Sequence, residues 1–244
     1  MRHINELRSN PDKNPKISPE QELKDFLAKN NSNIQNYFIT YRSDNKTGIN
    51  PNNKHRTPIG IYAYPLQYVK EKLTKDIMNV EWGGHRKFAI ILEYVGSNDK
   101  ILRDIKSYTS QQWETDSDKI IELAKKDSES DHYGIYLPNN LQAIKNKAKE
   151  TAFKNLPFFW IWNLMRLLTN QYSFNDHRKS QIYRTVQWNK YIRYIGYDAI
   201  VDEGLGLLHP NEPISSLFLT GPIVKNVKTI ILNHKKDPQR GYYD

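Results

Sequence analysis

Short apolar runs near both ends of the chain predict a β-sheet. Runs that are rich in β-branched and aromatic residues and are bounded by Asn, Gly or Pro are typical of strands. The runs that fit this pattern are residues 37–41, 59–64, 87–95, 199–201, 215–219 and 224–232. The run 87–95 (KFAIILEYV) is apolar at successive positions in its middle. It therefore predicts a central strand that is covered on both faces.

Other segments carry the signals of helices. Ser18 precedes a proline, and an amide follows at Gln21, three residues after the hydroxyl. This arrangement is typical of a helix start and predicts a helix over Pro19–Ala28. Apolar residues spaced by three and four predict a second helix over residues 66–77.

The middle of the chain, residues 99–194, looks mainly helical. Its apolar patches are Ile101, Leu102 and Ile105, then Ile120, Ile121 and Leu123, and then the aromatic segment 158–168. A last helical pattern leads to Gly196, and glycine is a natural C-terminal cap. We therefore expect a helical block here that packs on the sheet.

Strands at both ends of the chain with helices between them predict an α+β fold, because the strands must pair across a long sequence separation. We expect a single domain over residues 1–244. Its core is expected at about 36–95 and 182–232, with a helical insertion at about 99–181.

Composition narrows the class of protein. The 244 residues suffice for an ordinary core, and 5 Trp, 16 Tyr and 8 Phe argue against a disordered chain. The 36 Lys and Arg exceed the 27 Asp and Glu, which gives a net charge of +9 and favours a polyanionic partner. With no Cys, disulfides and thiolate chemistry are excluded, so we expect a reducing, cytoplasmic location.

We expect neither a leader peptide nor a membrane span. The first 16 residues lack the apolar core of a signal peptide. The longest apolar run, Phe158–Leu168, is interrupted by Asn163 and Arg166 and is too short to cross a bilayer. No membrane partner is therefore expected.

Common enzyme signatures are absent from the sequence. It has no G-x-G-x-x-G, phosphate loop, H-E-x-x-H or G-x-S-x-G pattern, and its seven His residues are scattered. We therefore expect no metal site.

Three segments combine aromatic, acidic and cationic residues. In FITYR (38–42), Thr40 and Arg42 share one face of the predicted strand. In TPIGIYAYP (57–65), Gly60 allows another group to approach closely, and Tyr62 and Tyr64 point the same way. The third segment, residues 196–219, comprises a strand, a turn and another strand, and it carries Asp202, Glu203 and Glu212.

The order of these segments resembles the mono-ADP-ribosyltransferases. Gly60-Ile61-Tyr62 matches the G-I-Y motif of the family, residues 196–200 match its glycine-tyrosine-aspartate strand entry, and Glu212 before 215–219 is similar to its closing glutamate. Thr40 stands where the family has His or Arg. The sequence looks closest to the tyrosine-motif type, shared with poly(ADP-ribose) polymerases and with enzymes of phage and mobile-element polyvalent proteins.

The resemblance implies a split-sheet ADP-ribosyltransferase-like core and NAD as the substrate. Glu212 and Tyr62 would be the catalytic residues. The residues expected to bind NAD are Thr40, Arg42, Gly60, Tyr62 and Tyr64. The ADP-ribose acceptor would be a macromolecule, either a nucleic acid or an acidic protein surface. A toxin or phage effector, neutralised by an inhibitor or antitoxin protein, is a related possibility.

Structural roles compete with these assignments. Tyr62 can pack against the insertion, Arg42 can be a solvated cation, and Glu212 can bond its own turn. Asp202 with Glu203 reads as a solvated turn pair.

The alternative function is a non-catalytic nucleic-acid-binding protein. In that case aromatic residues would stack bases, with Trp113, Trp160, Trp162 and Trp188 as candidates, although Trp160 and Trp162 lie in an apolar run typical of a core.

Overall fold

The computed structural model describes residues 17–42, 60–68, 88–130, 140–169, 177–208, 215–219 and 224–232. In these ranges the α-helices are α1 (Pro19–Lys29), α3 (Ser110–Ser130), α4 (Leu141–Glu150), α5 (Pro157–Thr169) and α6 (His177–Tyr194). The strands are β1 (Tyr37–Arg42), β2 (Gly60–Pro65), β3 (Phe88–Tyr94), β4 (Ile101–Leu102), β5 (Ala199–Asp202), β6 (Ser215–Leu219) and β7 (Val224–Ile231). Short 3₁₀ turns are η1 (Asn31–Asn36), η3 (Asn98–Lys100) and η4 (Ile105–Ser107).

The strands form one sheet in the order β4-β5-β6-β2-β1-β3-β7. The first three strands of the chain lie together, and strands from its last part flank them, since β6 lies beside β2 and β7 lies beside β3. All described neighbours are antiparallel except β4 and β5, which are parallel. The predicted α+β layout with non-local pairing is confirmed.

Strand β2 changes its partner along its length. Its last two residues pair with β1, in the register Phe38↔Pro65 and Ile39↔Tyr64. Its first four residues pair with β6, from Gly60↔Leu219 to Ala63↔Ser216. The sheet therefore consists of a β1–β3–β7 group and a β2–β6–β5–β4 group that are joined by a two-pair ladder.

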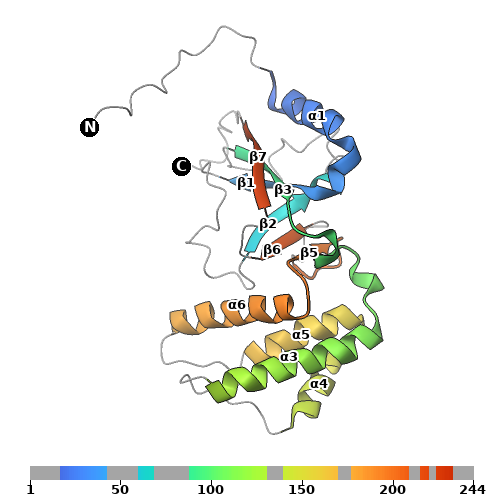
Figure 1. The fold of residues 1–244 in the computed structure, drawn as a ribbon, viewed down its shortest axis with the longest axis vertical. Helices are drawn as coiled ribbons and strands as arrows, with labels where there is room; N and C mark the ends of the chain where they lie inside the picture. Colours follow the sequence, from blue (N-terminus) through green and yellow to red (C-terminus); the bar gives the residue numbers. More distant parts are fainter. Residues whose placement is uncertain are drawn as a thin grey trace, which may run out of the picture.

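Helices cover one face of β2 at two places. Side chains alternate along a strand, so Tyr62 and Tyr64 point to the same face. Tyr62 contacts the hydrophobic core of the helical block α3–α6, whereas Tyr64 contacts the core beneath α1. Figure 1 shows α1 beside β1, β3 and β7, and α3–α6 stacked at the other end of the molecule.

The opposite face of the sheet is covered by strands of the other group. Phe38 of β1 and Ile90 of β3 belong to one buried cluster with Ala199 and Val201 of β5. Ala63 of β2 lies in the same cluster. The two strand groups therefore pack against each other on this side.

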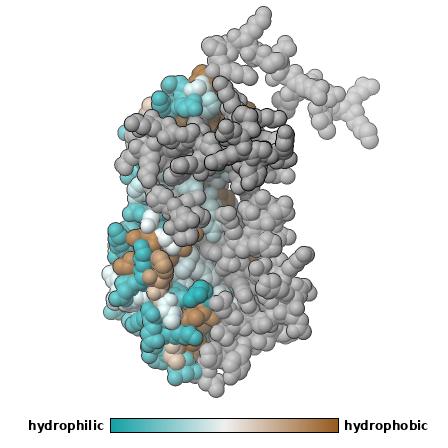
Figure 2. Space-filling view, turned by 180° about the vertical axis from the view of Figure 1, so that it is seen from behind, coloured by the Kyte–Doolittle hydropathy of each residue, from teal (hydrophilic) through white to brown (hydrophobic). Residues whose placement is uncertain are grey.

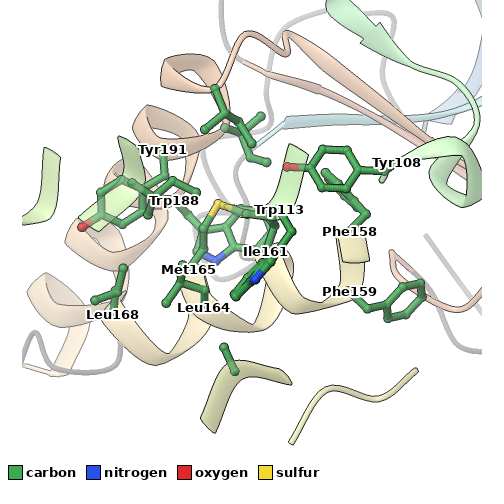
Figure 3. Close-up of a cluster of buried hydrophobic side chains, with 14 of the residues drawn as sticks. Tyr108, Trp113, Phe158, Phe159, Ile161, Leu164, Met165, Leu168, Trp188 and Tyr191 are labelled. Atoms are coloured by element: carbon green, nitrogen blue, oxygen red, sulfur yellow. The ribbon is translucent and has the colours of Figure 1, made fainter. Parts of the chain in front are cut away.

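The helical block is held by aromatic packing. Figure 3 shows side chains of α3, α5 and α6 in its core, including Trp113, Phe158 and Trp188. The ring of Trp113 lies 5.8 Å from that of Trp160, and the ring of Trp162 lies 3.9 Å from that of Trp188, both edge-to-face. Edge-to-face contacts are favourable beyond the burial of area. The predicted helical block is confirmed.

Two local signals are confirmed in detail. The Ser18 hydroxyl accepts a hydrogen bond from the backbone N–H of Gln21 at 3.2 Å, which caps α1. Gly196 has φ +105°, and the N–H groups of Gly196 and Tyr197 bond back to the carbonyls of Arg193 and Ile192. This is a Schellman cap, and glycine adopts its left-handed conformation without a steric penalty.

Two predictions were wrong, and one lies largely outside the described residues. Ile101 and Leu102 form strand β4 and not a helix, because Ile101↔Ala199 pairing with β5 overrides their local pattern. Asp202 is fully buried and not solvated. The helix predicted over residues 66–77 is described only at residues 66–68, which are helical.

Hydrophobic side chains reach the surface in separate patches. Figure 2 shows such patches among hydrophilic residues on one face. Among the described residues, the exposed large hydrophobic ones are Ile17, Val95, Phe153, Val186, Tyr194 and Ile231. Among the helices that could be searched, none is long and apolar enough to cross a membrane.

Candidate functional site

The candidate site is the junction of β1, β2 and β6, where the sequence motifs become neighbours. β1 carries Thr40 and Arg42, β2 carries Gly60, Tyr62 and Tyr64, and β6 follows the segment that contains Glu212. β2 lies between the other two strands. Residues far apart in the sequence are thus brought to one place by strand pairing.

Thr40 links β1 to β2 where their ladder ends. Its side chain is buried, and its hydroxyl donates a 2.9 Å hydrogen bond to the backbone carbonyl of Tyr62. The register places Thr40 on the face of Phe38 and Ala63, opposite to the face of the Tyr62 ring. Thr40 therefore contacts the backbone of β2 and does not share a face with Tyr62.

Three tyrosines lie on the helix-covered face of the junction. Tyr62 is partly buried against the helical block, and Tyr64 is partly buried against the core beneath α1. The ring of Tyr41 lies 6.3 Å from that of Tyr64. Burial raises the pKa of Tyr41, so its hydroxyl stays protonated at neutral pH. Its buried hydroxyl oxygen has no hydrogen-bond partner among the described residues.

The other expected site residues are placed only in part. Gly60 begins β2 and lies opposite Leu219 of β6. Arg42 ends β1 and pairs through its backbone register with Phe88 of β3. The Arg42 side chain and the whole of Glu212 lie outside the described residues, so their catalytic and NAD-binding roles stay predictions.

Asp202 is a residue of this region whose role the sequence did not reveal. It ends β5 opposite Ser215, the first residue of β6. Its carboxylate accepts backbone hydrogen bonds from Leu205 at 2.7 Å, Leu207 at 2.6 Å and Leu208 at 2.9 Å. Asp202 thus fixes the first part of the segment that leads from β5 to β6.

Two glycines allow the backbone of the loop after β5 to adopt left-handed conformations. Gly204 and Gly206 have φ of +84° and +83°, a region that other residues rarely adopt. An acid at the end of a strand followed by two glycines is the sequence signal that could have identified Asp202 as the organiser of the loop.

Two further polar contacts connect the parts of the sheet. The Tyr68 hydroxyl, just after β2, donates a hydrogen bond to the carboxylate of Glu203, just after β5. The Arg103 guanidinium, just after β4, donates to the carbonyl of Gln35 before β1 at 2.9 Å. Burial lowers the pKa of Arg103, although it stays charged at neutral pH. The first contact links the ends of two strands of the β2–β6–β5–β4 group, and the second links this group to the segment before β1.

The tryptophans expected as base-stacking residues lie in or against the helical core. Trp113 and Trp188 are buried, and Trp160 and Trp162 are partly buried against the same cluster. Since a stacked base needs an open ring face, Trp113 and Trp188 cannot supply one in this fold. Within the described part of the chain, no group of three or more His, Asp or Glu could hold a metal ion.

Comparisons with known proteins found no match for this chain among protein-family models, curated proteins or solved structures.

Proposed function

We propose that the protein is an ADP-ribosyltransferase that transfers ADP-ribose from NAD to a macromolecular acceptor. The observation that supports this best is the position of β2, the strand of Gly60-Ile61-Tyr62. It pairs with β1, which carries Arg42, and with β6, which follows Glu212 in the chain. Strand pairing thus makes neighbours of the three segments that resemble the family.

The proposed reaction breaks the bond between the nicotinamide nitrogen and C1′ of the ribose. The electron pair of this bond leaves with nicotinamide, and positive charge develops on the ribose as it nears an oxocarbenium ion. A nucleophilic oxygen or nitrogen of the acceptor then bonds to C1′ and loses its proton. The enzyme must stabilise the developing positive charge.

Glu212 is the proposed catalytic carboxylate. A carboxylate that accepts a hydrogen bond from the ribose 2′-hydroxyl stabilises the ribose more as its positive charge grows. This interaction strengthens in the transition state, so it raises the rate and not only the affinity.

Tyr62 and Arg42 are the proposed binding residues. The Tyr62 ring rests on the helical block and would stack on nicotinamide, an aromatic contact of about 1 kcal/mol. Arg42 would bind the pyrophosphate with its planar guanidinium from the end of β1, because Thr40, two residues earlier, lies on the face opposite to Tyr62. Thr40, whose hydroxyl holds the carbonyl of Tyr62, would position β2 rather than contact nicotinamide.

Nicotinamide release tests the proposal directly. Purified protein is incubated with NAD labelled in nicotinamide, with and without nucleic acid or protein acceptors. We expect Glu212→Gln to lower release at least a hundredfold, because one transition-state hydrogen-bonding group supplies about 10²–10³ in rate. Glu122→Gln is the matched control, because Glu122 lies on the exposed face of α3 in an ion pair with Lys126. Equal release by both variants, or none from the wild type, would contradict the proposal.

A toxin role makes a separate cellular prediction. If ADP-ribosylation harms the host cell, expression of the wild type arrests growth and Glu212→Ala relieves the arrest. Growth arrest that Glu212→Ala leaves unchanged would separate toxicity from the proposed chemistry.

A further inference from the structure

An exposed phenylalanine marks a second surface of interest, in the segment between α4 and α5. Phe153 is 78% exposed, more than any other large hydrophobic residue described. A single exposed apolar residue is ordinary in proteins. The surroundings of Phe153 are what distinguish it.

One side of the Phe153 ring contacts other residues of the protein. Its centroid lies 6.5 Å from that of the buried Phe159, with 31° between the ring planes. A Cβ atom built on Gly206 would lie 3.7 Å from Cε1 of Phe153, so the ring rests against the loop that follows β5. Lys154 Nζ lies 5.9 Å from the centres of both the Phe153 and Phe159 rings. The ring is therefore packed against the protein on one side and exposed to solvent on the other.

Lys154 lies beside this ring, and further cations without a carboxylate partner lie in the same part of the chain. Residues 141–169 contain five basic residues, Lys145, Lys147, Lys149, Lys154 and Arg166, and one acidic residue, Glu150. Lys145 and Lys149 are neutralised by α3, at 2.9–3.0 Å from Glu114 and Asp118. In the part of the chain that the structure describes, the other three form no ion pair.

Hydrogen bonds connect the backbone of Lys147 to the Arg166 guanidinium through the side chains of Thr151 and Asn163. The Thr151 hydroxyl donates to the carbonyl of Lys147 at 2.8 Å. Asn163 Nδ2 donates to the Thr151 hydroxyl at 2.9 Å, and the Arg166 guanidinium donates to Asn163 Oδ1 at 2.7 and 2.9 Å. Thr151 lies two residues before Phe153, so these hydrogen bonds bring the Arg166 guanidinium to the same segment of the chain as Phe153 and Lys154.

We propose that this surface, made of Lys147, Phe153, Lys154 and Arg166, binds a single-stranded nucleic acid that is the acceptor of ADP-ribose. A base stacks on an open aromatic ring, and cations beside the ring bind the phosphates. A duplex keeps its bases stacked on each other, so it cannot use the ring. An acidic protein would use the cations but would not need an exposed ring.

The position of the surface links it to the candidate site. Gly206, against which Phe153 packs, belongs to the connection from β5 to β6, and Glu212 lies in the same connection of the sequence. As an acceptor site the surface rests on the proposed function, whereas its binding of nucleic acid can be measured without NAD.

Fluorescence anisotropy with a labelled oligothymidine measures the binding. We expect Phe153→Ala to weaken it about tenfold, the loss of one stacked base. The control Tyr194→Ala, which removes an aromatic residue that is 44% exposed on α6, should leave it unchanged. The double variant Lys154→Gln/Arg166→Gln should reduce the slope of log affinity against log salt concentration by about 1.4, because it loses two phosphate contacts. Lys126→Gln, at an exposed ion pair on α3, should not change that slope.

Three results would overturn the inference. These are equal binding by Phe153→Ala and Tyr194→Ala, equal binding of duplex and single strand, and displacement of the strand by polyglutamate at equal charge. The last would assign the surface to an acidic protein.

Transfer of labelled ADP-ribose to the strand separates the two proposals. If both hold, Phe153→Ala loses transfer to the strand but keeps nicotinamide release without acceptor. Strand binding with no nicotinamide release would refute only the proposed function, together with the acceptor role. Nicotinamide release that is insensitive to the strand would refute only the acceptor role.

Discussion

The helical block and the β1–β2–β6 junction are stabilised in different ways. The block has a large core with buried aromatic rings from three helices, among them Trp113 and Trp188. The junction has a smaller buried cluster, a ladder of only two residue pairs between β1 and β2, and individual polar contacts such as those of Thr40 and Asp202. Apolar packing stabilises through many small contacts, whereas a buried hydrogen bond depends on a single pair of atoms.

We therefore expect substitutions in the two regions to affect stability and activity differently. Substitutions in the block should change the free energy of unfolding and leave the activity of each folded molecule unchanged. Substitutions of junction side chains that border the proposed NAD site should also change the activity of folded molecules. The following predictions test this separation, from the largest expected effect on stability to the smallest.

Truncation of Trp113 should have the largest effect. Trp113→Ala removes a fully buried ring and leaves a cavity, so we expect a loss of about 3–5 kcal/mol in the free energy of unfolding by urea. Trp113→Phe fills part of the cavity and should lose less. Under conditions where the variant is folded, nicotinamide release per folded molecule should match that of the wild type. A large loss of release in folded Trp113→Ala would show that the block and the junction are not separable.

Removal of the Asp202 carboxylate should have the next largest effect. Asp202→Ala leaves three backbone N–H groups without their acceptor, so we expect a loss of about 2–4 kcal/mol. Asp202→Asn retains one acceptor oxygen and should fall between Asp202→Ala and the wild type. Hydrogen exchange should become faster at Leu205, Leu207 and Leu208 before it does in α5. Uniformly faster exchange throughout the molecule would argue against a local role for Asp202.

The phenol of Tyr108 should make the block sensitive to alkali. Burial, and then the hydrogen bond and negative charge of Asp116, raise its pKa above the value of about 10 in an unfolded chain. Above pH 10 the unfolded chain therefore loses this proton while the folded protein keeps it. The contribution of the raised Tyr108 pKa to the free energy of unfolding is fully present below pH 10. It is lost as pH rises above 10, by at most about 1.4 kcal/mol per pH unit.

Tyr108→Phe tests this pH dependence. The variant lacks the 2.7 Å hydrogen bond to Asp116, so at pH 8 we expect it to be less stable by about 1 kcal/mol. The wild-type and variant stabilities, measured by urea unfolding from pH 8 to pH 11, should converge at high pH. Parallel curves would mean that the Tyr108 phenol does not contribute to the alkaline loss.

Removal of the Thr40 hydroxyl should have the smallest effect on stability. Thr40→Val keeps the shape of the side chain but loses the hydrogen bond to the Tyr62 carbonyl, about 1 kcal/mol. We expect nicotinamide release to fall more steeply than stability, and Thr40→Ser to restore both. If nicotinamide release changes only in proportion to stability in the wild type, Thr40→Val and Thr40→Ser, Thr40 has a structural role only.

The local elements of the fold could be read from the sequence, whereas their arrangement could not. The cap at Ser18 and the glycine at Gly196 depend on neighbouring residues, so their signals are complete in a short stretch of chain. Strand β6 was predicted at its observed bounds for the same reason. The order of the strands depends on contacts between distant residues, which no local pattern contains.

The limits are clearest at Ile101 and Asp202. Ile101 was predicted to be helical because its apolar neighbours fit a helical face, but its pairing with β5 determines its conformation. A solvated turn pair was the structural alternative for Asp202 with Glu203, yet Asp202 is buried and three loop N–H groups compensate for its burial. Of the candidate site, the adjacency of β1, β2 and β6 followed only from the structure, and the roles of Glu212, Arg42 and Tyr62 stay predictions.

The pairing of early strands with strands made much later has a consequence for synthesis on the ribosome. β1, β2 and β3 leave the ribosome first, but the partners that cover the free edges of β2 and β3 are β6 and β7, which are made after the whole helical block. During that interval the nascent chain holds strands with unpaired edges, a form prone to pairing with other chains. Early folding of α3–α6, whose contacts are local, would proceed while the first strands wait for chaperones or for their late partners.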